Sequence, residues 1–168
     1  ERRLGDVWDP SSGELDASVR PNMVIAAALE LSPLSRDQRA GVVQRAELEL
    51  VTPRGLRTLS PREAAYRGEY AGGPEERDAA YHQGTAWPWL AGFHVEATLR
   101  AFPGDRARRD RLVELLGGLV ATTREGGLNH VSEVFDGDPP QRAGGCFAQA
   151  WSTAELLRAR QLLEEPAP

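Results

Sequence analysis

Residues 126–151 read GGLNHVSEVFDGDPPQRAGGCFAQAW, and the rest of the chain is organised around this stretch. It places a carboxylate (Glu133) beside an aromatic ring (Phe135), an Asp-Gly-Asp-Pro-Pro turn and a Gly-Gly step. The stretch then continues directly into the last apolar segment. Long loops that are rich in glycine, proline and aromatic residues, and that also carry charge, often hold functional sites. We therefore expect a site in this loop, with a helix directly after it.

A second stretch, residues 81–89 (YHQGTAWPW), carries the same kinds of side chain. His82 and Gln83 can bond to sugar hydroxyls, while a tryptophan ring can stack on the apolar face of a sugar. Of the two tryptophans, we expect Trp89 in the core and Trp87 at the pocket. The alternative is that both are core residues and that His82 only caps a helix. We predict that the two stretches are halves of one sugar-binding pocket.

Helical periodicity covers much of the remaining chain. The expected helices are residues 23–31, a segment that starts at Ser35 and ends before Pro53, residues 84–102, residues 105–120 and residues 147–157. Ser35 and Gln38 have the spacing of a capping box, and Pro88 is tolerable in a first helical turn. The apolar positions expected to face the core are Val43, Ala46, Leu50, Leu112, Leu115, Leu116, Leu119, Val120, Phe147, Ala150, Trp151, Ala154 and Leu157.

The segments between these helices show little periodicity. Residues 1–20 are expected to be an irregular lead-in and residues 164–168 a tail. Residues 52–84 are expected to form a long loop at the rim of a site, with one helical turn near residues 62–65. No stretch alternates convincingly as a strand, although residues 131–135 can pair briefly. The predicted fold class is all-α, with helix hairpins stacked side by side.

Composition excludes several classes of function. The 168 residues include 25 acidic and 20 basic side chains, a net charge of −5, which does not favour nucleic-acid binding. No apolar run approaches the roughly 18 residues that a membrane span needs. A single cysteine, Cys146, excludes an internal disulfide and is compatible with a reducing compartment. We expect one soluble, cytoplasmic domain that contacts neither a membrane nor a nucleic acid.

Several side chains have both a chemical and a structural interpretation. Glu133 is either a catalytic carboxylate or an ordinary exposed glutamate. Asp136 and Asp138 resemble a tight turn more than a metal site, because the further acidic positions of a calcium loop are missing. Cys146 is expected to be a small apolar plug rather than a nucleophile. His94 is expected to be a buried, hydrogen-bonded histidine, and the role of His130 is left open.

Several longer runs carry a resemblance to a known family. They are residues 20–22 (RPN), 52–61 (TPRGLRTLSP), the pattern Tyr66-x-Gly68-x-Tyr70-x-Gly72, residues 77–78 (RD), 81–89 (YHQGTAWPW), 132–140 (SEVFDGDPP) and 145–151 (GCFAQAW). With these runs the chain resembles the C-terminal amylo-α-1,6-glucosidase domain of bacterial and archaeal glycogen-debranching enzymes.

The resemblance implies a fold and an activity. The fold is an α/α toroid of paired helices, of which this chain is the C-terminal and incomplete part. The activity is hydrolysis, with inversion, of the α-1,6-linked glucose left at a branch point of glycogen or limit dextrin, without a metal or another cofactor. Glu133 matches the family's general base, while the general acid lies upstream, in the remainder of the catalytic domain. The expected substrate-binding residues are Tyr81, His82, Gln83, Gly84, Thr85, Trp87, Phe135 and Asp136.

Two other functions stay open at this point. One is a different toroid glycosidase, similar to a trehalase or a glucoamylase. The other is a glycan-binding module without catalytic activity. Because one carboxylate alone cannot protonate a leaving group, we expect the isolated chain to be inactive.

Overall fold

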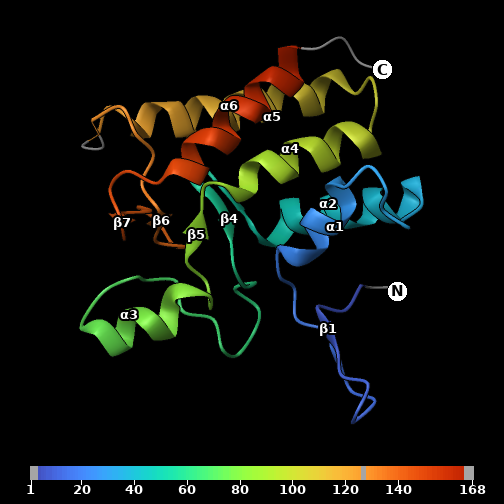
Figure 1. The fold of residues 1–168 in the computed structure, drawn as a ribbon, viewed down its shortest axis with the longest axis horizontal. Coiled ribbons are helices and arrows are strands. Elements are labelled where there is room, and N and C mark those ends of the chain that lie inside the picture. Colours follow the sequence, from blue (N-terminus) through green and yellow to red (C-terminus); the bar gives the residue numbers. More distant parts are fainter. Residues whose placement is uncertain (1–3, 126–127, 165–168) are drawn as a thin grey trace.

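A computed structural model describes residues 4–125 and 128–164 of the chain (Figure 1). Among these residues it contains six helices, and the expected tail after Glu164 lies outside the described part. The helices are α1 (Asn22–Ala28), α2 (Arg36–Glu49), α3 (Pro74–Tyr81), α4 (Leu90–Ala101), α5 (Arg106–Thr122) and α6 (Ala150–Glu164). Helix α4 is central, because it packs against α1, α2, α5 and α6. None of the described helices is long and apolar enough to cross a membrane.

The helix starts predicted from capping residues are confirmed. The Ser35 hydroxyl accepts a hydrogen bond from the Gln38 backbone N–H, and the Gln38 side chain accepts one from the Ser35 N–H. The Asp105 side chain accepts from the Arg108 N–H and thereby begins α5. Both side chains satisfy N–H groups that have no partner within the helix.

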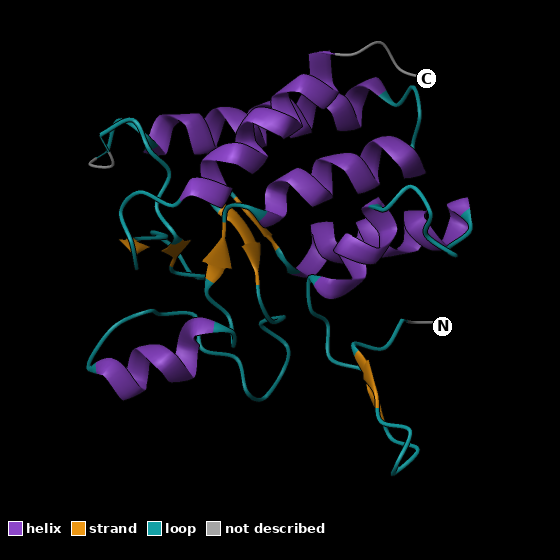
Figure 2. Cartoon of the chain, in the orientation of Figure 1, coloured by secondary structure: helices purple, strands orange, loops and turns teal. Residues whose placement is uncertain are grey.

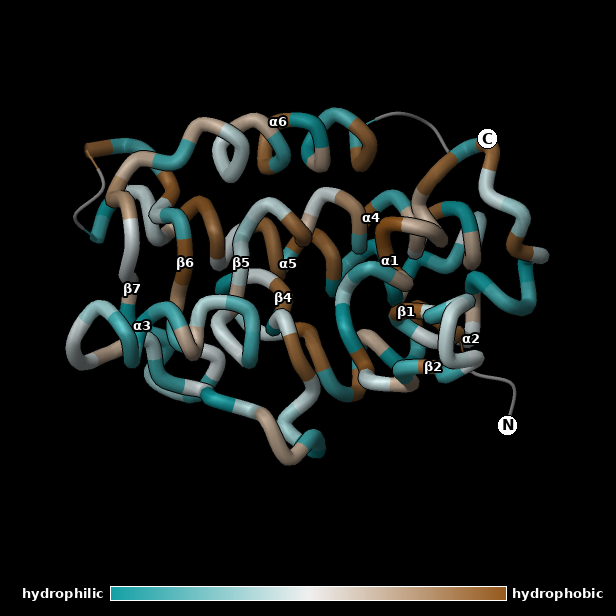
Figure 3. The backbone as a smooth tube through the Cα atoms, turned by 60° about the horizontal axis from the view of Figure 1, so that its bottom comes forward, coloured by the Kyte–Doolittle hydropathy of each residue, from teal (hydrophilic) through white to brown (hydrophobic). Residues whose placement is uncertain are grey.

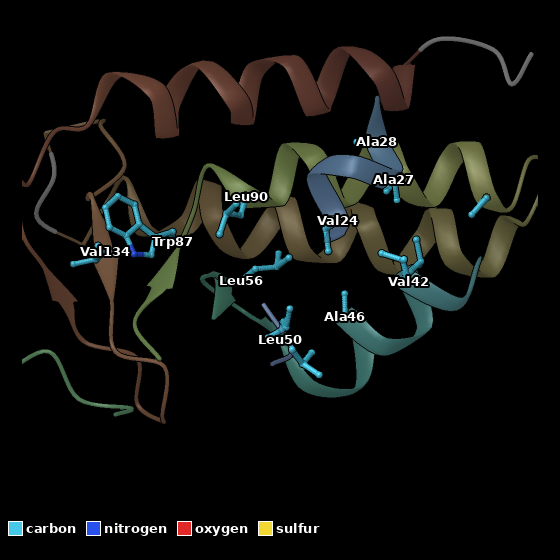
Figure 4. Close-up of a cluster of buried hydrophobic side chains, with 14 residues drawn as sticks. Val24, Ala27, Ala28, Val42, Ala46, Leu50, Leu56, Trp87, Leu90 and Val134 are labelled. Atoms are coloured by element: carbon cyan, nitrogen blue, oxygen red, sulfur yellow. The ribbon is translucent and has the colours of Figure 1, made fainter. Parts of the chain in front are cut away.

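The core-facing positions predicted for α2 and α5 also lie inward. Val43, Ala46 and Leu50 are fully buried, and so are most members of the α5 stripe. One core cluster lies between α1, α2, α4 and the strands, as Figure 4 shows for Val24, Ala46 and Leu56. A second cluster joins α4, α5 and α6 around residues such as Val95 and Leu119.

The prediction of an all-α fold is confirmed only in part, because the described residues form six helices but also a five-stranded antiparallel sheet. Its strands are in chain order: β3 (Val51–Thr52), β4 (Gly55–Arg57), β5 (Ala86–Trp87), β6 (Val134–Phe135) and β7 (Ala143–Gly144). The sheet lies between the main block of helices and the separate helix α3 (Figure 2). Strands of two or three residues are too short to show an alternating pattern, so the sequence contains little signal for them.

Two segments expected to be irregular are ordered. Residues 52–84 contain a β3–β4 hairpin and helix α3, rather than one long loop. The sequence of α3, PEERDAAY, has no apolar stripe: Ala80 is its one fully buried residue, and Figure 3 shows this helix as mostly hydrophilic. The lead-in forms a second small hairpin from β1 (Val7–Trp8) and β2 (Leu15–Asp16), closed by a turn in which the Asp9 carboxylate accepts from Ser11 and Ser12.

Helix α4 begins at Leu90 and not at Gly84. The residues before it are extended, since Ala86 pairs with Arg57 and Trp87 pairs with Leu56 in the sheet. Their backbone groups bond to a neighbouring strand, so they are not available for a helical turn. The apolar spacing from Trp87 onward therefore crosses a boundary between a strand and a helix.

The prediction of which residues of the last helix face the core is also wrong. Phe147, Trp151 and Leu157 are 59%, 46% and 61% exposed, while the buried residues of α6 are Ser152, Leu156 and Ala159. The face of α6 that meets α4 is thus mostly small. Helices α4 and α6 approach closely at Gly92 of α4, where an added Cβ atom would meet the carboxylate end of the Glu155 side chain of α6.

Gly84 holds the turn between α3 and β5, and alanine is expected to be poorly tolerated there. Its φ angle is +144°, and an added Cβ would lie 2.4 Å from the Arg67 carbonyl oxygen. Strain and collision together should lower the free energy of unfolding by about 3 kcal/mol in Gly84→Ala, measured by urea denaturation. Gly41→Ala is the matched control, because Gly41 is helical with open space around it and should gain about 0.5–1 kcal/mol. Equal effects of the two substitutions would contradict this assignment.

Candidate active site

Glu133 lies immediately before β6, and three hydrogen-bond donors hold its carboxylate. Oε1 accepts from the Tyr81 hydroxyl at 2.6 Å and from the Gln149 side-chain amide at 3.1 Å, and Oε2 accepts from the Cys146 backbone N–H at 2.9 Å. The side chain is half-buried. An ionised carboxylate has about four lone-pair sites, so about one remains for a water molecule or a substrate group.

The backbone explains why these groups meet. The Glu133 N–H donates to the Cys146 carbonyl, next to the pairing of β6 with β7. Strand β6 also pairs with β5, where Phe135 lies opposite Ala86, and this places the loop of Glu133 beside the segment that follows α3. Tyr81 is the last residue of α3 and reaches across to Glu133. The two stretches expected to form one pocket therefore lie side by side.

Tyr81 is a hydrogen-bond donor at this site. Burial and the hydrogen bond to Glu133, in that order, raise the pKa of the Tyr81 phenol well above its usual range. The phenol therefore keeps its proton at neutral pH. Trp87 holds Tyr81 in place, because the Trp87 indole N–H donates to the Tyr81 carbonyl oxygen at 3.0 Å and the two rings meet edge to face.

The aromatic residues around Tyr81 form a continuous group. The His82 ring is exposed and stacks on Trp87, with centroids 5.5 Å apart and planes 12° from parallel. Trp89 stacks on Trp151 at 4.9 Å. The structure reverses the expected order of burial: Trp87 is 4% exposed and belongs to the core, while Trp89 is half-buried. Packing against both Tyr81 and the sheet explains the burial of Trp87.

Four other predicted substrate-binding residues lie beneath this surface. Gly84, Thr85, Phe135 and Asp136 are all buried. The Thr85 hydroxyl donates to the Ala80 carbonyl, and the Asp136 carboxylate accepts from the Tyr70 N–H at 2.7 Å and from the Arg142 guanidinium at 3.1 Å. The contacts of Thr85 and Asp136 hold the two loops beneath this surface. Gln83 is closer to the surface, and its side-chain oxygen accepts from Arg20 at 2.9 Å.

Sequence reasoning missed Gln149 and the backbone of Cys146 as partners of Glu133. Both belong to the run of residues 145–151, which signalled the family resemblance but contains no charged side chain to suggest chemistry. Cys146 is exposed and is not the expected apolar plug. It also precedes α6 by four residues, so it does not lie at a helix start.

The side chains of Asp136 and Asp138 do not support a metal site. The Asp136 oxygens are engaged as described, and Asp138 Oδ1 accepts from the Tyr66 hydroxyl at 2.8 Å. Burial is the larger cause and this hydrogen bond the second of a rise in the pKa of the Tyr66 phenol to about 12. Within residues 4–125 and 128–164, no three His, Cys, Asp or Glu side chains are grouped so that they could hold a metal ion.

Glycosidases cleave with carboxylates placed beside the glycosidic bond, and Glu133 is a half-buried carboxylate with room for a further hydrogen bond. Comparison with known proteins points to the same class. A family model described as amylo-alpha-1,6-glucosidase matches residues 1–158. The chain is also similar to the glycogen debranching enzyme of Saccharomyces cerevisiae (strain ATCC 204508 / S288c), with 33% identity over 98 residues.

The chain belongs to the amylo-alpha-1,6-glucosidase family, as the resemblance of its sequence motifs predicted. The part that matches the yeast enzyme is 55% of this chain but only 6% of the length of the yeast enzyme.

Proposed function

We propose that this chain supplies the general base of an inverting α-1,6-glucosidase that removes the glucose left at glycogen branch points. The single observation that carries this proposal is the environment of Glu133 in a chain of this family. Tyr81, Gln149 and the Cys146 N–H fix both carboxylate oxygens and leave room for one further hydrogen bond. A general base in this reaction must hold one water molecule in a constant direction.

The chemistry of the step follows from these groups. Glu133 accepts a proton from the bound water while the water oxygen attacks the anomeric carbon of the terminal glucose. The α-1,6 bond breaks, and the leaving oxygen takes a proton from a general acid on the opposite side of the sugar. The product is β-glucose. Inverting enzymes separate the two carboxyl groups by roughly 6.5–9.5 Å, which leaves space for the water.

The general acid is assigned to the remainder of the catalytic domain, which is also the main partner of this chain. We propose that helices from that remainder complete an α/α toroid with α1–α6, around the end of the sheet where Glu133 lies. The exposed rings of Phe147 and Trp151 support this arrangement, because they lie on the segment that directly follows Cys146, a partner of Glu133, and are available for contact with those helices. The substrate is glycogen, limit dextrin or a related α-glucan in the cytoplasm, and no cofactor is required.

The isolated 168-residue chain is therefore expected to release no glucose from limit dextrin, because the general acid is assigned to the remainder of the domain. A protein that contains this chain and the rest of the domain should release glucose. Enzymatic glucose detection over several hours measures both, with the Glu133→Gln form as background. Glucose release by the isolated chain above that background would contradict the proposal.

The same longer protein distinguishes the proposed substrate from the alternatives. Panose contains an α-1,6 bond, whereas maltose and trehalose contain α-1,4 and α,α-1,1 bonds. We expect panose to be the preferred substrate by at least about tenfold in kcat/KM. A preference for trehalose or maltose would assign the chain to another glycosidase activity, and no release from any of the three would favour a glycan-binding module.

A further inference from the structure

A cleft of about 410 Å³ opens between the N-terminal hairpin, the start of α1 and the segment from His82 to Leu90. Glu133 and Tyr81 do not line it. Its size falls within the roughly 300–1,000 Å³ that is usual for small-molecule sites. Its apolar lining includes Ile25, Trp89 and Leu90, and its polar lining includes Asp6, Arg20, Asn22, His82 and Gln83.

A connected set of hydrogen bonds holds the polar lining of the cleft. The Asp6 carboxylate, whose side chain is only 7% exposed, accepts from the Asn22 side-chain amide at 2.8 Å and lies 3.8 Å from the Arg20 guanidinium. Arg20 also donates to the Gln83 side-chain oxygen at 2.9 Å and to the His82 carbonyl at 2.7 Å. A buried carboxylate with this support is a built feature of the wall and not a mobile surface group.

These bonds determine what the wall offers to a ligand. Because the Gln83 oxygen accepts from Arg20, the Gln83 NH₂ group is left to donate. Because the Asn22 NH₂ group donates to Asp6, the Asn22 carbonyl oxygen is left to accept. The wall therefore offers both a donor and an acceptor, and a sugar hydroxyl group can bond to either.

The charges of the cleft also restrict its ligand. Asp6 and Arg20 are opposite in sign and lie close together, so the wall has almost no net charge. An anion such as phosphate would need a cation without a counter-charge. A neutral ring with hydroxyl groups on its edge and C–H groups on its face fits both the polar lining and the apolar lining of the cleft.

We propose that this cleft is a second glucosyl-binding subsite, separate from the one at Glu133. The choice of an α-glucan as the ligand rests on the proposed function. The rings of Tyr81, His82 and Trp87 form the wall between the two sites, with centroids 4.8 Å apart for Tyr81–His82 and 5.5 Å for His82–Trp87. One oligosaccharide thus reaches both sites across the exposed His82 ring, and the cleft holds a glucose unit one or more positions from the scissile bond.

A titration of the ¹⁵N-labelled 168-residue chain with panose, followed by NMR, tests this subsite. Saturable shifts are expected at the backbone amides of Asp6, Asn22 and Gln83. Asn22→Ala should weaken the apparent Kd at least fivefold. His82→Ala should do the same, and because His82 is exposed this second variant is expected to fold normally. Gln44→Ala, a substitution of an exposed polar residue on α2 away from the cleft, should bind panose like the unmodified chain.

Two results would overturn the subsite. One is the absence of shifts around the cleft at 20 mM panose, or shifts confined to Tyr81 and Cys146. The other is unchanged affinity in both Asn22→Ala and His82→Ala. Glu133→Gln separates this inference from the proposed function, because it should strongly lower glucose release by the longer protein and leave binding in the cleft intact. A longer protein that releases no glucose from panose would refute the activity, while the titration would still decide the subsite.

Discussion

Glu133→Gln, made in a protein that contains the complete catalytic domain, is expected to lower kcat on panose by about 10²–10⁴-fold with little change in substrate binding. General base catalysis typically contributes that factor. Glutamine has the same size as glutamate and keeps an oxygen that can accept from Tyr81 or from the Cys146 N–H. It cannot take a proton from water at neutral pH. The kinetic parameters kcat and KM, together with equilibrium binding of panose, measure the result.

Glu30→Gln provides the control for this substitution. Glu30 is exposed and follows α1, so the same change of charge there should alter kcat less than twofold. A loss of less than tenfold in Glu133→Gln would remove Glu133 from the role of general base. A large increase in KM with unchanged kcat would instead assign Glu133 to substrate binding.

The folded protein is expected to be about 2 kcal/mol less stable at pH 5 than at pH 7.5, mainly because of His94. Burial in α4 lowers the pKa of His94 to about 4, with Arg108 acting in the same direction and Glu47 against it. Its Nδ1 atom is buried without a hydrogen-bond partner. Between that pKa and the ordinary value near 6.5, the unfolded chain binds the proton and the folded chain does not. Stability is therefore complete above about pH 6.5 and falls as the pH decreases toward 4.

His94→Leu should flatten this dependence, because leucine cannot be protonated in either state. The free energy of unfolding from urea titrations at pH 5, 6 and 7.5 measures the slope. The other two histidines, His82 and His130, are exposed and serve as the comparison: His130→Leu should retain the full slope. Identical slopes in the unmodified chain and in His94→Leu would refute the assignment.

Sequence reasoning predicted the helices where capping and apolar spacing agree. The Ser35 capping box and the Asp105 cap mark the starts of α2 and α5, and the buried residues of both helices include most of the periodic stripe. It failed where tertiary contacts decide the conformation. Trp87 lies at helical spacing from Leu90, but its backbone pairs with Leu56 in the sheet. The partner strand is thirty positions away, so no local pattern contains that information.

For the site, the sequence identified Glu133 and the segment that meets it, but not the donors that hold Glu133. Tyr81, which was expected to bind substrate, donates to the carboxylate. Gln149 and the Cys146 N–H were not expected, because a neutral amide and a backbone group have no characteristic pattern in a sequence. Phe135 and Asp136, which the resemblance placed among the substrate-binding residues, are buried beneath the surface.

The most direct test of the central claim is a rescue experiment with azide. In Glu133→Ala, placed in the complete catalytic domain, the base is missing and a small anion can occupy its space. Azide needs no base, so it can attack the anomeric carbon from the face where the water molecule would stand. We predict that azide restores turnover of panose and that the product is β-glucosyl azide, identified by NMR of its anomeric proton. No rescue by azide, or formation of the α-glucosyl azide, would contradict the assignment of Glu133 as the general base of an inverting glucosidase.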